Sequence, residues 1–240
     1  MIKEKLITML GTVLALAVSV PLFLHWNPEF LFREENAPVT AADIRQNPTK
    51  DFAGAQAGDD IPRLSGAEDF SALLYGIDYA TAEPTDIIAT GVYSLKPWVN
   101  PYRTRQVNGR TVTGKRKPQI VTSPFVLEED YNQYYLLKLP DGTFLLAQIP
   151  PDAVSAIRQG EHMTLPVGRK DGLTDTARNH LATICETYDV SMDGVFYAFS
   201  EEWYREHSFS LFLLRFSAAA VVFFVVAVGV ILTGNRILKQ

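Results

Sequence analysis

The sequence predicts an α+β protein in which a small antiparallel β-sheet or partial barrel, with flanking helices, lies between two transmembrane helices. Three observations lead to this prediction. Two apolar stretches lie near the two ends of the chain. Alternating β-branched runs and tight-turn signals fill residues 86–170. Segments with helical spacing precede and follow that β-rich core.

The second apolar stretch, residues 209–232, carries a single charged residue, Arg215. A helix of this length rises ~36 Å, which is enough to cross a hydrocarbon core of ~30 Å. A helix that is apolar on every face gains nothing in water, so we expect a transmembrane span. Arg215 lies near the outer end, and we expect its stem to reach the headgroups rather than to form a buried functional charge.

The first apolar stretch, residues 6–24, contains no charged residue. It rises ~28 Å as a helix, which is a marginal to adequate span. A cleaved signal peptide is the alternative, because residues 15–17 are small. The apolar run continues past them, and this favours an uncleaved signal anchor.

The short flanks predict the topology. Lys3 and Lys5 precede the first span, and Arg236 and Lys239 follow the second. Short basic flanks stay in the cytoplasm, so residues 1–5 and 233–240 are expected inside the cell membrane and the central domain outside. The lone cysteine, Cys185, excludes an intrachain disulfide.

The region before the β-rich core, residues 25–85, is weakly patterned. We expect short helices at residues 40–46 and 68–75. The segment after the core, residues 171–208, is expected to be helical and to lead to the membrane. Thr174 caps its first helix, which ends near Tyr188, and Glu201 and Glu202 begin a helix that runs into the second span.

The core is expected to contain two hairpins. Asn108-Gly109 supplies the two positive-φ residues of a type I′ turn. A second hairpin joins residues 133–139 to 143–149, and both arms are apolar on both faces, as in the centre of a sheet. The other expected elements are strands at 87–95, 119–127 and 163–167, a helix at 151–159, a turn at 168–172, and a segment at 195–199 that fits either strand or helix.

The sequences YYLLKLPDGTFLLAQIP (134–150) and LPVGRK (165–170) resemble uncharacterised two-span membrane proteins of Gram-positive, clostridia-type bacteria. Those proteins have a similar strand–turn–strand with an Asp-Gly turn, then a short helix and a Leu-Pro-x-Gly strand. The resemblance implies an architecture and a membrane location. It implies no activity and no functional residue.

Charge is unevenly distributed between the two spans. Residues 25–208 contain 26 acidic and 17 basic residues, which argues against nucleic-acid binding. Residues 87–127 nevertheless contain seven basic residues and no acid. The candidate anion-binding residues are Arg103, Arg105, Arg110, Lys115, Arg116 and Lys117. They would bind lipid headgroups or an anionic wall polymer at about 1 kcal/mol per charge. The alternative is a solvated hairpin whose like charges discourage edge pairing.

No catalytic motif or metal-ligand spacing is found, and no cofactor is expected. His180 and Cys185 are five positions apart on one predicted helix, so they do not face each other. We expect the acidic residues near His207 to be solvated rather than to bind a metal.

These observations favour a membrane-anchored extracytoplasmic module that binds a partner protein or an anionic envelope component and is not an enzyme. One alternative is an accessory subunit of a membrane complex that acts through its spans, where residues 218–220 and Gly229 offer small surfaces for helix packing. Another is an envelope hydrolase or transferase whose site is not recognised.

Overall fold

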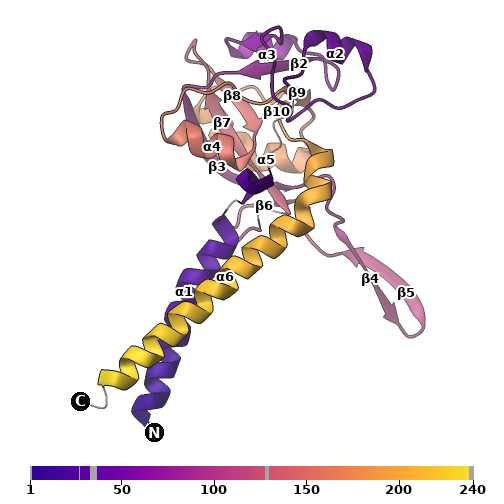
Figure 1. The fold of residues 1–240 in the computed structure, drawn as a ribbon. Helices are drawn as coiled ribbons and strands as arrows, with labels where there is room; N and C mark the ends of the chain where they lie inside the picture. Colours follow the sequence, from indigo (N-terminus) through magenta and orange to yellow (C-terminus); the bar gives the residue numbers. More distant parts are fainter. Residues whose placement is uncertain (1, 27, 33–36, 128–129, 238–240) are drawn as a thin grey trace. The chain divides into compact units, whose positions relative to one another are not determined.

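The computed structural model describes residues 2–26, 28–32, 37–127 and 130–237 (Figure 1). The chain divides into two units. Residues 1–33, 127–129 and 206–240 form a helical unit, and residues 34–126 and 130–205 form an α+β unit. Lys239, one of the four basic residues behind the topology prediction, lies outside the described residues.

The helical unit contains α1 (Ile2–His25), the short 3-10 helix η1 (Glu29–Phe32) and most of α6 (Glu201–Ile237). Helices α1 and α6 lie side by side (Figure 1), and the rings of Phe23 and Phe212 meet edge to face at 5.7 Å. Both helices are long and apolar enough to cross a membrane, over Lys5–His25 and Glu201–Gly234. Only 17% and 11% of their most apolar windows are buried in the protein, unlike the core helix of a soluble protein.

Arg215 does not lie at the outer surface of its helix. Its side chain is only 2% exposed, and the residues one turn before and after it, Leu211 and Ala219, are also buried. The expectation that Arg215 extends towards headgroups is therefore wrong, because protein atoms already enclose the side chain.

The α+β unit is built on a mixed eight-stranded sheet, so the small antiparallel sheet or partial barrel was the wrong prediction. The strand order is β1-β2-β9-β10-β8-β7-β3-β6, and the pairs β1–β2 and β8–β10 are parallel. The strands are β1 (Arg63–Leu64), β2 (Tyr79–Ala82), β3 (Asp86–Leu95), β6 (Ile120–Val121), β7 (Tyr131–Lys138), β8 (Phe144–Gln148), β9 (Gly168–Asp171) and β10 (Val195–Tyr197).

The late strand β10 explains this difference. It inserts between β8 and β9 although it follows them in sequence. Its residues Val195, Phe196 and Tyr197 are each at most 3% exposed, which suits a strand covered on both faces. The sheet then continues through β9 to β2 and β1, from the weakly patterned region.

The hairpin of β7 and β8 lies in the centre of the sheet, as predicted. On one face, Leu137 and Leu145 belong to a core completed by α4 (Pro151–Arg158) and by Phe70 of α3 (Ala67–Ala72). On the other face, Leu136 and Leu146 pack in a core with α5 (Asp175–Thr187). Burial on both faces accounts for the unbroken apolar runs in the sequence.

The short helix expected at residues 40–46 is α2 (Ala41–Gln46), and the structure adds a capping box of Thr40 and Asp43 at its start. The predicted cap of α5 is confirmed. The hydroxyl of Thr174 accepts a hydrogen bond from the Ala177 amide at 3.2 Å and caps α5. Helix α6 begins at Glu201 and continues unbroken to Ile237.

Two strand predictions need correction, and one open assignment is settled. Residues 163–167 form no strand, whereas β9 occupies Gly168–Asp171, where a turn was expected. Gly168 fits this position because a Cβ would overlap the buried ring of Phe196. Within 119–127 only β6 pairs, and the ambiguous segment 195–199 contains the strand β10.

A separate two-stranded ribbon joins β4 (Tyr102–Val107) to β5 (Arg110–Lys115), as predicted (Figure 1). Its turn residues Asn108 and Gly109 have φ of 50° and 74°, as a type I′ turn requires.

We predict that Gly168→Ala lowers the free energy of unfolding by about 1–3 kcal/mol, because the added methyl overpacks the core at Phe196. Gly172→Ala is the matched control, since its Cβ would meet nothing within 4 Å, and it should change stability by less than about 1 kcal/mol. Urea unfolding of the full chain in detergent, followed by pulse labelling of the buried Cys185 thiol, measures both. Equal stabilities of the two variants would contradict the close approach of the Gly168 backbone to the Phe196 ring.

Candidate functional site

The register of the β4–β5 ribbon sorts its side chains onto two faces. Arg105 lies opposite Val112, Val107 opposite Arg110, and Arg103 opposite Gly114. Directly opposed residues share a face, and alternate residues along a strand do too. Arg103, Arg105 and Arg110 therefore lie with Val107 and Val112 on one face, which we call the arginine face.

The opposite face is mostly uncharged. Thr104 pairs with Thr113 and Gln106 with Thr111, and each pair has side-chain oxygen or nitrogen atoms 3.3 Å apart. Lys115, opposite Tyr102, is its single charged residue. We call this surface the threonine face.

The structure brings together three of the six candidate residues. Arg103, Arg105 and Arg110 are exposed and form no ion pair within the described part of the chain. Lys115 lies on the threonine face, and Arg116 follows the end of β5. Lys117 differs from the others, because it forms an ion pair with Asp130 and its charge is neutralised.

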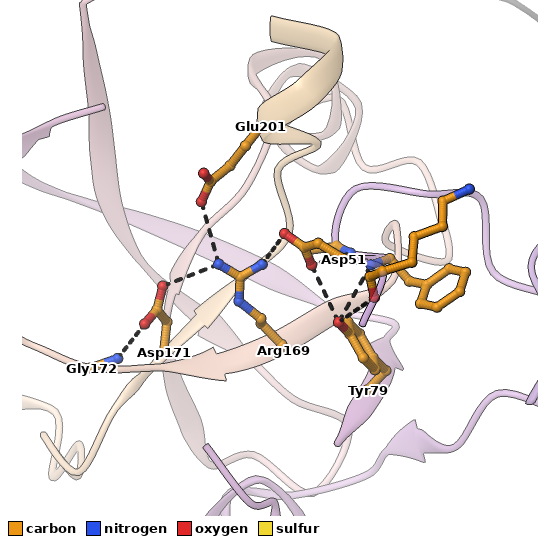
Figure 2. A network of polar contacts seen from close by, with 9 residues as sticks. Asp51, Tyr79, Arg169, Asp171, Gly172 and Glu201 are labelled. Atoms are coloured by element: carbon orange, nitrogen blue, oxygen red, sulfur yellow. Dashed lines mark hydrogen bonds and ion pairs between the residues drawn. The ribbon is translucent and has the colours of Figure 1, made fainter. Parts of the chain in front are cut away.

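A second charged cluster surrounds Arg169 of β9 (Figure 2). Its guanidinium forms ion pairs with Asp51, with Asp171 at 3.6 Å and with Glu201 at 3.3 Å. The same group lies 5.1 Å from the centre of the Tyr197 ring. Burial by itself lowers the pKa of Arg169, but Asp51, Asp171 and Glu201 raise this pKa on balance above its ordinary value.

Tyr79 fastens the loop at residues 50–52 to this cluster. Its hydroxyl donates to the Asp51 carboxylate at 3.3 Å and accepts from the Phe52 amide at 3.4 Å (Figure 2). Burial raises the pKa of the Tyr79 hydroxyl. The segment around Asp51, the strand β9 and the first residue of α6 thus meet at one guanidinium.

The cluster is one end of a polar row that crosses the sheet. Tyr79, Arg169, Tyr197 and Gln148 are successive register partners on β2, β9, β10 and β8. Gln148 donates to the Ser94 hydroxyl of β3 at 2.7 Å. Gln148 is two residues after Leu146 on β8, so both side chains lie on the same face of the sheet. Leu146 packs in the core with α5, and register partners share a face, so the whole row lies on the α5 side of the sheet.

Two lysines of the α+β unit are also buried against aromatic rings. The Lys96 ammonium lies 4.9 Å from the centre of the Tyr204 ring and 5.5 Å from that of Trp98. The Lys170 ammonium donates to the Ser71 carbonyl at 3.0 Å and lies 4.9 Å from the Tyr75 ring centre. Lys96 and Lys170 are 5% and 4% exposed, so their ammonium groups interact with protein groups in the interior and are not accessible to a ligand.

These charged groups fit a structural role. The carboxylates of Asp51, Asp171 and Glu201 all face one guanidinium, which forms an ion pair with each of them and balances one of their three charges. The described residues contain no group of His, Cys, Asp or Glu side chains suited to a metal ion. Cys185 is a buried core residue, and burial raises the pKa of its thiol, which disfavours the nucleophilic thiolate.

Sequence reasoning missed the Arg169 cluster. It assigned residues 168–172 to a turn and Glu201 to a solvated helix start. The acidic first turn of α6 was the one sequence feature that pointed to a charged contact. The partner of Glu201, Arg169, is 32 residues away, and the local pattern does not reveal it. No family model, curated protein or solved structure matches the chain.

We predict that Arg169→Met lowers the free energy of unfolding by about 1–2 kcal/mol, because three carboxylates lose their common partner, although their side chains are 40%, 47% and 24% exposed and solvent screens them. The Arg169 side chain is 15% exposed. Arg63→Met is the control: Arg63 pairs with Glu83 at 2.8 Å, but its side chain is 55% exposed. The control should cost under about 1 kcal/mol. Urea unfolding measures both, and equal losses would show that the cluster contributes no more than a surface pair.

Proposed function

We propose that this chain is a membrane-anchored module that binds an anionic component of the cell envelope through the arginine face. The observation that carries the proposal is the placement of Arg103, Arg105 and Arg110 on one exposed ribbon face. The planar guanidinium presents donors in a fork that matches phosphate and carboxylate groups. Three such groups on one short ribbon suit a ligand with repeated negative charges.

The distribution of charge supports the proposal. The other basic side chains of the α+β unit include Arg169, Lys170 and Lys96, which are engaged in the interior. Residues 87–127 contain no acid, although residues 25–208 are acidic as a whole. A positive ribbon on an acidic domain directs anions to one place and disfavours their binding elsewhere.

The proposal includes the location of the domain. With α1 and α6 as spans, Lys3, Lys5 and Arg236 favour cytoplasmic termini and an extracytoplasmic α+β unit. Membership in the two-span family that residues 134–150 resemble is part of the same proposal. The hydrolase or transferase alternative gains no support, because the carboxylates that converge in the domain are paired with Arg169.

We predict that Arg105→Gln weakens anion binding about fivefold, the loss of one charge contact. Lys115→Gln removes the same charge from the same ribbon, but on the threonine face, and should weaken binding by less than about twofold. The measurement is titration of the full chain, in nanodiscs of zwitterionic lipid, with inorganic polyphosphate.

A charge-matched control tests whether net charge alone is responsible. The triple variant Arg103→Gln, Arg105→Gln, Arg110→Gln should lose nearly all binding. The triple variant Arg45→Gln, Arg158→Gln, Arg178→Gln changes the net charge equally outside the ribbon and should retain it. Equal losses in the two triples, or polyphosphate binding by neither the native chain nor its variants, would refute the proposal.

A further inference from the structure

We infer that the anionic component is the phosphate-bearing headgroup layer of a lipid bilayer. This inference rests on the proposed function and names its ligand. The arginine face is not purely cationic, because Val107 and Val112 lie among its arginines and are 39% and 42% exposed. The opposite face has threonine and glutamine at the corresponding positions.

Two exposed valines among three arginines suit one kind of surface. A soluble polyanion contacts the guanidinium groups and gains nothing from apolar side chains beside them. At a bilayer surface the arginines meet headgroup phosphates while small apolar side chains enter the boundary between headgroups and acyl chains. The pattern of charge plus apolar surface on one face therefore favours lipid over a wall polymer.

The location of the valines agrees with this geometry. Val107 ends β4 and directly precedes the turn residues Asn108 and Gly109, so the apolar surface lies at the tip of the ribbon. Arg110 follows the turn and lies opposite Val107. The tip thus presents one apolar and one cationic side chain together.

Contact with a bilayer surface would also stabilise the ribbon. All twelve residues of β4 and β5 are exposed, and a two-stranded ribbon alone is marginally stable in water. Its amides should therefore exchange with solvent quickly unless something covers them. A chain anchored by α1 and α6 is always near headgroups, so even weak contacts have a high effective concentration of ligand.

Hydrogen exchange of the full chain in nanodiscs tests the inference. Nanodiscs of phosphatidylglycerol should slow amide exchange of residues 102–115 at least about fivefold relative to phosphatidylcholine, a change equivalent to one charge contact. The double variant Val107→Thr, Val112→Thr keeps shape and charge, and should lose most of that protection. Thr111→Ser with Thr113→Ser alters the threonine face instead and should keep it.

Polyphosphate binding in phosphatidylcholine nanodiscs distinguishes the proposed anion-binding function from the assignment of lipid as the ligand. The native chain and the valine variant should bind polyphosphate equally. Polyphosphate binding without protection by phosphatidylglycerol would overturn the lipid assignment and leave the anion-binding function standing. Equal protection of the native chain and the valine variant would also overturn it, because charge alone would then suffice. The absence of both effects would overturn the lipid assignment and the proposed function together.

Discussion

The ion pairs of Arg169 hold together segments of the α+β unit that the apolar core alone does not join. The guanidinium joins three carboxylates from parts of the chain that are far apart in sequence: Asp51 before β1, Asp171 at the end of β9, and Glu201 at the start of α6. The Arg169 side chain is 15% exposed, whereas those of its three partners are 24% to 47% exposed, so one mostly buried cation holds three partly solvated carboxylates in place. The central hairpin of β7 and β8 supplies the apolar core, and Arg169 of β9 contacts the Tyr197 ring of β10, the segment before β1 and the start of α6.

The same principle divides the basic residues into two groups. Lys170 and Lys96 are buried and Arg169 is mostly buried, beside carboxylates, a carbonyl or aromatic rings, so these residues contribute to the fold and offer little to a ligand. Arg103, Arg105 and Arg110 lie on a ribbon that carries no carboxylate and contributes nothing to the main sheet. We expect binding to involve charged residues that share one exposed face and make no contribution to the core. The three ribbon arginines meet both conditions, and this is why the proposed function is assigned to them.

Much of the fold was predictable because its signals are local. The Asn108-Gly109 turn, the Thr174 cap and the double-sided apolar runs of β7 and β8 each depend on a few neighbouring residues. The position of β10 and the Arg169 cluster were not predictable, because they depend on pairing between distant segments that no local pattern encodes. The arginines of the candidate site were identified by composition, whereas their common face needed the ribbon register. The pairing of Lys117 with Asp130 also became visible only in the structure.

The most direct test of the central claim, a membrane-anchored module with an extracytoplasmic domain, is the side of the membrane on which the ribbon lies. Cys185, the sole native cysteine, is replaced by serine, and a cysteine is introduced at Thr111, which is exposed on the threonine face. Asn108 is avoided, because its φ of 50° suits few residues other than asparagine and glycine. Intact cells are treated with a membrane-impermeant maleimide, with permeabilised cells as the control. The account predicts labelling in intact cells, and labelling only after permeabilisation would contradict it.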